Sequence, residues 1–254
     1  MAKILDVHVH IGEDLYRSCT PEMALERMDR NGIEQAVISP LPTYPTPEGV
    51  KSSQKQNDRI AEALQKYPDR FVRGLGVVDP RHGQAAVPEV DRIFGALGLH
   101  GLLFSNDKTG LTMDNPVMCE FLSHAAQYEN PVVFAYTSQY SVLQAPFMLE
   151  KMARSFPSIQ FINGSALKDS THANCSRYMS SILDNIYIDI ADMNQLLGVL
   201  RSAITESGID KILFGSNIPS CDICPEIINL ESTDLSDEEK RQIYYDNAAK
   251  LFRL

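Results

Sequence analysis

The sequence repeats one pattern eight times: a short apolar run rich in β-branched residues, followed by a longer segment with helical periodicity. Near-continuous apolar runs are typical of parallel strands covered on both faces, and their alternation with helices indicates βαβ units. Eight such units predict an α/β fold, a single (β/α)8 TIM barrel whose one domain spans residues 1–254. A doubly wound open sheet is the alternative, but no glycine-rich phosphate loop follows the first strand. The predicted strands are 3–10, 35–39, 71–77, 101–104, 131–136, 159–163, 186–190 and 211–215.

The predicted helices begin at recognisable capping signals. Thr20 precedes Pro21, the order expected where a side-chain oxygen caps a helix and proline occupies its first turn. Asn115, which is also followed by a proline, predicts a second helix start of the same kind. Near the C-terminus, residues 236–239 fit a capping box, and the helix that they open is predicted to continue to about Phe252.

Residues 40–52 fit neither the strand nor the helix pattern. The stretch is rich in proline, threonine and serine, and it follows the second predicted strand. It is therefore predicted to be a loop at the C-terminal mouth of the barrel. Two interpretations stay open for it: a solvated loop, or a lid or dimer contact.

The net charge argues against two classes of partner. The formal charge is −10, whereas a nucleic-acid-binding surface needs clustered Lys and Arg side chains. The same charge is repelled by anionic membrane surfaces, and no apolar run approaches the roughly 20 residues that cross a bilayer. Five scattered cysteines indicate reduced thiols, so a cytoplasmic location is expected. The pair Cys221 and Cys224 has no second pair with which to complete a zinc site.

The candidate chemistry begins at the end of the first predicted strand, with Asp6, His8 and His10. Strand alternation predicts these three side chains on one face and Val7 and Val9 on the other. On a barrel, the valines would then face the covering helices while the imidazoles face the mouth. Imidazole nitrogens bind zinc and similar ions at about 2.0–2.1 Å. His8 and His10 are therefore the predicted metal ligands.

Residues 6–12 resemble the opening motif of the amidohydrolase-2 family, a group of metal-dependent TIM-barrel hydrolases and decarboxylases. Further segments are similar to that family in the same order along the chain, namely 68–80, 98–102, 210–219 and 246–252. The resemblance implies an active site at the C-terminal ends of the strands and a small-molecule substrate. It also raises a homodimer as one assembly to test.

The other ligands that the resemblance implies are replaced in this sequence. The family has a histidine at the end of the fifth strand, where this chain has Ala135 or Tyr136, and another at the sixth, where it has Asn163. Its aspartate at the eighth strand is Asn217 here. A neutral amide supplies no negative charge and cannot act as a general base, so Asn163 and Asn217 are predicted to donate hydrogen bonds to substrate or water. The metal site is predicted to be incomplete, and the cofactor to be a divalent metal, zinc by preference, or none.

A few other residues offer replacement ligands. Glu13 and Asp14 could turn back from the first loop, and His172 follows the sixth predicted strand. An exposed loop position is the favoured interpretation for all three. Asp189 fits a polar strand-end residue of the resembled family, but it is not assigned as a ligand.

Three functions stay open at this point. The leading hypothesis is a metal-dependent hydrolase of the amidohydrolase-2 type, in which the bound metal activates water for attack on a small molecule. A decarboxylase on the same scaffold is one alternative. The other is a non-catalytic, metal-free relative that binds a small molecule or a partner subunit, because a fold does not by itself imply a function.

Overall fold

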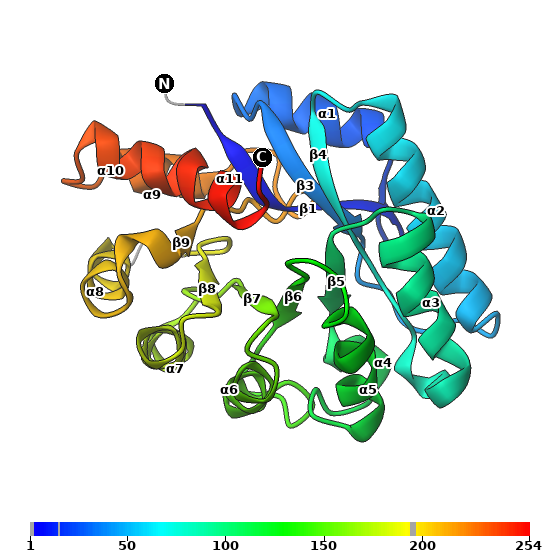
Figure 1. Cartoon of the computed structure of the whole chain (residues 1–254). Coiled ribbons are helices and arrows are strands. Elements are labelled where there is room, and N and C mark those ends of the chain that lie inside the picture. Colours follow the sequence, from blue (N-terminus) through cyan, green and yellow to red (C-terminus); the bar gives the residue numbers. More distant parts are fainter. Residues whose placement is uncertain (1–2, 15, 194–196) are drawn as a thin grey trace.

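In the part of the chain that the structure describes, eight strands form the inner ring (Figure 1). The computed structural model describes residues 3–14, 16–193 and 197–254. Every predicted strand coincides with an observed one, and their ends agree within three residues. The strands of the ring are β1 (Leu5–Glu13), β3 (Gln35–Pro40), β4 (Phe71–Gly76), β5 (Gly101–Phe104), β6 (Val132–Tyr136), β7 (Gln160–Gly164), β8 (Ile186–Asp189) and β9 (Ile212–Leu213).

The ring closes between its last and first strands. Neighbouring strands pair in parallel from β1 through to β9. Just after β9 the chain returns to β1, where the Val7 amide donates to the Phe214 carbonyl at 3.0 Å and the His10 amide donates to the Ile218 carbonyl at 2.8 Å. An extra two-residue strand, β2 (Ser18–Cys19), pairs antiparallel with the end of β1. The predicted (β/α)8 barrel is confirmed.

The helices lie outside the ring of strands (Figure 1). Because they cover the outer faces of the strands, both faces of each strand are buried, which explains the continuous apolar runs. The main helices are α1 (Pro21–Arg30), α2 (Val50–Lys66), α3 (Val87–Asp91), α5 (Pro116–Ala125), α6 (Pro146–Ser155), α7 (Ser170–Ile182), α8 (Leu197–Ser207), α9 (Pro225–Glu231), α10 (Asp237–Arg241) and α11 (Asn247–Leu251). Shorter helical segments are η1 (Pro80–Ala86), η2 (Arg92–Ala96), α4 (Asn106–Thr109), η3 (Ile209–Lys211) and η4 (Gln242–Asp246). Among the described residues, no helix combines the length and the apolar character that crossing a membrane requires.

The predicted helix starts are confirmed. Thr20 accepts a hydrogen bond from the Met23 amide at the start of α1, and the Asn115 side chain accepts one from Val117 at the start of α5. The capping box opens α10 with both of its reciprocal hydrogen bonds. One detail of the prediction is wrong: the C-terminal helix is not continuous, because the π-helical segment η4 separates α10 from α11.

The proline-rich loop after β3 is shorter than predicted. It ends at Gly49, which has a positive φ of 60°, and α2 begins at Val50. The last three residues of the predicted irregular stretch are therefore helical. A glycine suits this position because residues with a Cβ avoid positive φ.

The regular alternation predicted along β1 is wrong at one step. The pairing of β1 with β3 changes register between Asp6 and Val9. Val7 packs in an apolar cluster with Phe134 and Leu213, whereas Val9 packs in a separate cluster that includes residues of the covering helices. The two valines therefore do not share one face, as simple alternation would require.

Candidate functional site

Polar side chains from four strands meet at the carboxyl end of the barrel, where TIM-barrel enzymes have their active sites. His8 and His10 come from β1, Ser39 from β3, Tyr136 from the end of β6 and Asp189 from the end of β8. Tyr136 is partly exposed, and the other four are buried. The fold thus brings together residues that are up to 181 positions apart in the chain.

Two imidazoles and one phenol converge on a single point. The Nε2 atoms of His8 and His10 lie 3.1 Å apart. The Tyr136 hydroxyl oxygen lies 2.5 Å from Nε2 of His8 and 2.7 Å from Nε2 of His10. The hydroxyl therefore fills the space between the two nitrogens that sequence analysis predicts as metal ligands.

The opposite nitrogens of the two rings are also engaged. Nδ1 of His8 lies 2.7 Å from Oδ2 of Asp189, and Nδ1 of His10 lies 2.8 Å from the Ser39 hydroxyl. Asp189 accepts two further hydrogen bonds from backbone amides, at 2.9 and 3.1 Å. A carboxylate behind an imidazole fixes both the ring orientation and the nitrogen that holds the proton.

Burial and neighbouring charge shift the pKa values of these groups in different directions. Burial lowers the pKa of His8, but the charge and hydrogen bond of Asp189 outweigh it and raise this pKa above 6.5. Burial lowers the pKa of His10 well below 6.5 and raises that of the Tyr136 phenol well above 10. Burial also raises the pKa of Asp6 to about 6. The centre therefore favours a charged His8, a neutral His10 and a protonated phenol.

These residues do not fit the divalent metal that the family resemblance implies. Both Nε2 atoms already contact the Tyr136 hydroxyl, and the Asp189 carboxylate faces Nδ1 of His8. Within residues 3–14, 16–193 and 197–254, no three His, Cys, Asp or Glu side chains are grouped to hold an ion. Structural zinc sites usually have four protein ligands and catalytic sites three. Two histidines and a neutral phenol fall short of that set.

The predicted residue Asn217 lies close to this centre. It lines the same cavity as His10 and Tyr136. Its φ is +56°, a conformation that asparagine tolerates better than most residues. Its amide donates to Asp192 at 2.9 Å. The structure therefore brings Asn217 to the same cavity as His10, one of the two predicted histidines.

The predicted residue Asn163 lies in a separate, fully buried network. Its carbonyl accepts from the Thr137 hydroxyl at 2.8 Å, and its amide donates to the Ser176 hydroxyl of α7 at 2.9 Å. The exposed loop position favoured for His172 is wrong: this residue is buried in α7 and contacts the same Thr137 hydroxyl at 2.5 Å. Asn163 and His172 thus connect β7 to α7 and are not brought to the cavity that His10 lines.

The other two possible replacement ligands form ion pairs at the surface. Glu13 pairs with Arg59 at 3.1 Å, and Asp14 pairs with Arg17 at 3.0 Å. Neither carboxylate contacts the histidine centre. The predicted exposed loop position is wrong in part for each residue: Glu13 is exposed but is the last residue of β1, and Asp14 lies in the loop but is partly buried.

A cavity of about 370 Å³ opens beside the histidines. Its volume falls within the usual range for small-molecule sites, about 300–1,000 Å³. His10, Tyr136 and Asn217 line it together with two cationic side chains, Arg17 and Lys108. One carboxylate, Asp107, also lines it. The cavity therefore combines two cationic side chains and one anionic side chain with groups that hold or accept protons.

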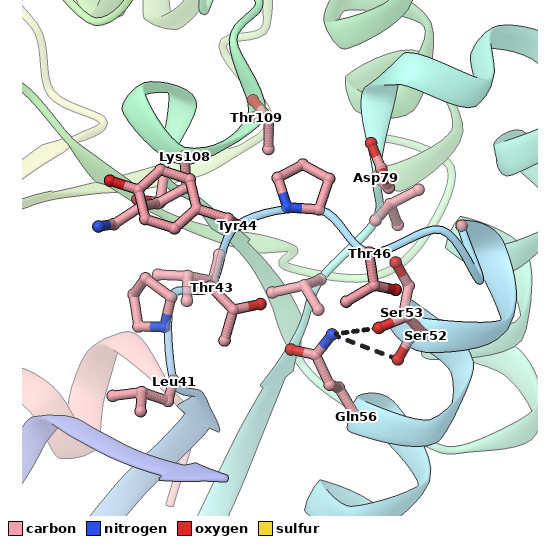
Figure 2. Close-up of a pocket in the computed structure, with 17 residues that line it drawn as sticks. Leu41, Thr43, Tyr44, Thr46, Ser52, Ser53, Gln56, Asp79, Lys108 and Thr109 are labelled. Atoms are coloured by element: carbon pink, nitrogen blue, oxygen red, sulfur yellow. Dashed lines mark hydrogen bonds between the residues drawn. The ribbon is translucent and has the colours of Figure 1, made fainter. Parts of the chain in front are cut away.

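A smaller pocket of about 60 Å³ lies next to this cavity, between the loop after β3, α2 and the region of Lys108 (Figure 2). The Lys108 ammonium group lies 4.3 Å from the centre of the Tyr44 ring, which Figure 2 shows beside it. Both residues also line the larger cavity. The small pocket has too little room for an aromatic acid, but the cation–π contact holds Lys108 at the boundary between the two spaces.

Sequence reasoning missed several members of the site. The sequence pattern identifies position 136 only as one that lacks the family's histidine, and it gives no role to Ser39, Arg17 or Lys108. Ser39 and Tyr136 end predicted strands, so the rule that barrel sites form at strand ends could have found them. Arg17 and Lys108 lie on loops or short helices, and no local pattern marks them.

Comparison with known proteins identifies similar sequences and folds. The amidohydrolase family pattern (Amidohydro_2) matches residues 173–254. The γ-resorcylate decarboxylase of Polaromonas sp. strain JS666 is 22% identical over 286 residues, which cover 89% of this chain and 85% of that protein.

Two solved structures share the whole fold. The 2,6-dihydroxybenzoate decarboxylase from Rhizobium matches with a TM-score of 0.78 and 18% identity, over 100% of this chain and 99% of its own. A dihydroxybenzoic acid decarboxylase from Polaromonas sp. JS666, solved with bound manganese and the inhibitor 2-nitroresorcinol, matches with a TM-score of 0.75 and 17% identity, over 100% and 98% of the two chains. The resemblance to the amidohydrolase-2 family is thereby confirmed, and the metal named in the second structure is manganese, not zinc.

Proposed function

From this shared fold and partial sequence match, we propose that the chain is a decarboxylase of small aromatic carboxylic acids. The relatives that support this are decarboxylases of γ-resorcylate and of dihydroxybenzoate. They favour the decarboxylase alternative over the hydrolase that was the leading hypothesis from sequence.

The observation behind the proposal is the composition of the 370 Å³ cavity. Arg17 and Lys108 are suited to a carboxylate, because Arg binds it through a planar pair of N–H groups and Lys as a point charge. The Arg17 side chain is 41% exposed and shares its charge with Asp14. The two cations therefore supply attraction and orientation for an anionic substrate, not a closed binding clamp.

Decarboxylation then needs a proton at the carbon that loses CO2. When the bond to the carboxylate breaks, its electron pair stays on the ring carbon, and CO2 leaves. Tyr136 lines the cavity, and in this proposal its hydroxyl donates the proton to that carbon. The resulting phenolate recovers a proton from His8, which lies 2.5 Å away and whose positive charge Asp189 balances.

A second candidate function is binding without catalysis. It is favoured by the centre itself, in which the two imidazoles and the phenol contact one another with no metal between them. The same cavity would then hold a small carboxylate as a ligand or signal. Both functions use Arg17 and Lys108, so turnover is what separates them.

The test is a turnover assay with a panel of hydroxybenzoates and 5-carboxyvanillate, following CO2 release. Wild type is expected to decarboxylate at least one acid. Tyr136→Phe should lower kcat by about 10²-fold or more, the usual range for a lost general acid. Arg17→Ala should raise KM about 10-fold with a smaller change in kcat, while Arg30→Ala on α1, outside the cavity, is the matched control.

The outcomes separate the two candidates. Binding of an acid by calorimetry, weakened by Arg17→Ala and without CO2 release, would support the binding function instead. Neither binding nor turnover across the panel would refute both. Turnover that is equal in wild type and Tyr136→Phe would exclude the phenol as the proton donor.

A further inference from the structure

The contact between Tyr136 and the two histidines also affects whether the centre can bind a metal ion. We infer that the Tyr136 hydroxyl takes the place of a metal ion between His8 and His10, and that a histidine at position 136 would convert this centre into a three-imidazole metal site. The inference is independent of which acid, if any, the cavity accepts.

The two imidazoles already have the spacing of metal ligands. Two nitrogens that bind one ion at about 2.0–2.1 Å must lie roughly 3–3.5 Å apart. The Nε2 atoms of His8 and His10 are 3.1 Å apart, and both rings point these atoms at the same place. The place itself is filled, because the Tyr136 oxygen contacts both nitrogens at 2.5 and 2.7 Å.

The rings do not depend on the phenol for their orientation. His8 is held through Nδ1 by Asp189, and His10 is held through Nδ1 by Ser39. Both contacts lie on the sides of the rings that face away from Tyr136. Replacing the phenol therefore leaves the two Nε2 atoms at the spacing of metal ligands. Hydrogen bonds to the other ring nitrogen fix the orientation of metal-binding imidazoles in general.

The phenol is also fixed in its position. Tyr136 pairs with Gly164 on the adjacent strand, and its ring packs edge-on against Phe134 at 5.5 Å between centroids. A histidine side chain is shorter than a tyrosine side chain by roughly one metal–nitrogen bond, about 2 Å. An ion bound to a histidine at position 136 would therefore lie close to the point where the hydroxyl oxygen now lies.

The contacts of the phenol explain why the present centre excludes a metal. Its hydroxyl oxygen already lies within hydrogen-bond distance of Nε2 of both His8 and His10. An ion would have to displace the hydroxyl and leave it without its two hydrogen-bond partners in a buried setting, which is unfavourable. Because the ion would gain only two imidazole ligands, it is not expected to displace the hydroxyl.

The experiment measures metal content after incubation with excess Mn²⁺ or Zn²⁺ and desalting, by mass spectrometry. Wild type and Tyr136→Phe are expected to retain less than about a tenth of an equivalent, since neither has a third imidazole and both keep an aromatic ring beside the point between the two nitrogens. Tyr136→His is expected to retain about one equivalent. That metal should be lost in Tyr136→His/His10→Ala and kept in Tyr136→His/His124→Ala, where His124 is a matched histidine on α5 outside the centre.

Two results would overturn the inference. One is wild-type protein that retains about an equivalent of metal and loses it in the His8→Ala/His10→Ala double variant. The other is a Tyr136→His variant that folds, as judged by circular dichroism, yet retains no metal. If that variant does not fold, Tyr136→Ala supplies the test, because it opens the point to the ion and its water ligands. It must then take up Mn²⁺ or Zn²⁺ at least 10-fold more tightly than wild type, and equal uptake would overturn the inference.

The readout also separates this inference from the proposed function. Metal content does not depend on turnover, so a chain that decarboxylates no acid can still satisfy the metal prediction. Conversely, a wild type that decarboxylates an acid and also binds metal tightly through His8 and His10 would support the first proposal and overturn the second.

Discussion

Replacing Asp189 with asparagine tests how the histidine centre is held. The side chain is fully buried, and both of its oxygens accept hydrogen bonds. Oδ2 faces Nδ1 of His8 at 2.7 Å and the Ser165 amide at 2.9 Å, while Oδ1 faces the Ala191 amide at 3.1 Å. Asparagine has the same shape but only one acceptor oxygen, so its NH2 group must oppose at least one of these donors in either orientation.

The expected loss in unfolding free energy is about 3–5 kcal/mol, the usual cost of removing one partner from a buried ion pair. Packing does not contribute, because the two side chains have nearly equal volume. In a chain of this size, each kcal/mol of lost stability lowers the thermal midpoint by about 2–4 °C, so the midpoint is expected to fall by roughly 6–20 °C.

The assay is thermal unfolding followed by far-ultraviolet circular dichroism, since the chain has no tryptophan. Asp184→Asn, at an exposed position just before β8, is the matched control and is expected to stay within about 0.5 kcal/mol of wild type. A loss below about 1 kcal/mol for Asp189→Asn would refute the reasoning. His8 would then be held by contacts other than the carboxylate.

Two further predictions concern a glycine and a buried acid. Gly101→Ala should abolish folding or lower the free energy of unfolding by more than about 3 kcal/mol, because a Cβ there would lie 1.9 Å from the Val132 carbonyl oxygen. Gly198→Ala in α8 should instead raise the free energy of unfolding by about 0.5–1 kcal/mol, because a Cβ there would have nothing within 4 Å. Thermal midpoints of the two variants check this, and a folded Gly101→Ala protein of wild-type stability would contradict it. Burial raises the pKa of Glu226 from 4.5 to about 8, so the folded state binds this proton more tightly than the unfolded state does. The free energy of unfolding of wild type should therefore fall as pH rises from about 4.5 through 8. Glu226→Gln should flatten that dependence in urea titrations at pH 5, 7 and 9, and an equal slope in both proteins would count against it.

The strands could be predicted from sequence because their physical cause is local. A strand covered on both faces needs a largely apolar run, and most of the predicted strands have one, such as 131–136. Helix starts could be predicted for the same reason, since Thr20 and Asn115 cap amides two or three residues away. The interrupted C-terminal helix and the register change after Asp6 depend on packing against distant elements, which local patterns do not encode.

The site was predictable only where its residues are neighbours in sequence. His8 and His10 are two positions apart on one strand, so their proximity follows from strand geometry. Tyr136 lies 128 positions from His8, and its contact with both imidazoles depends on how the barrel closes. Asn163 was correctly placed near a strand end, but packing against Ser176 directs its amide toward α7.

The closure of the barrel links the stability of the fold to the occupancy of the cavity. β9 contains two residues, and the chain after it returns to β1 through the amides of Val7 and His10. His10 lines the cavity on one side of this joint, and Asn217 lines it on the other. A molecule that contacts both residues bridges the joint and stabilises the closed form, because ligands favour the state that binds them. Slowed hydrogen exchange at the Val7 and His10 amides would therefore report occupancy of the cavity, even for a ligand that is never turned over.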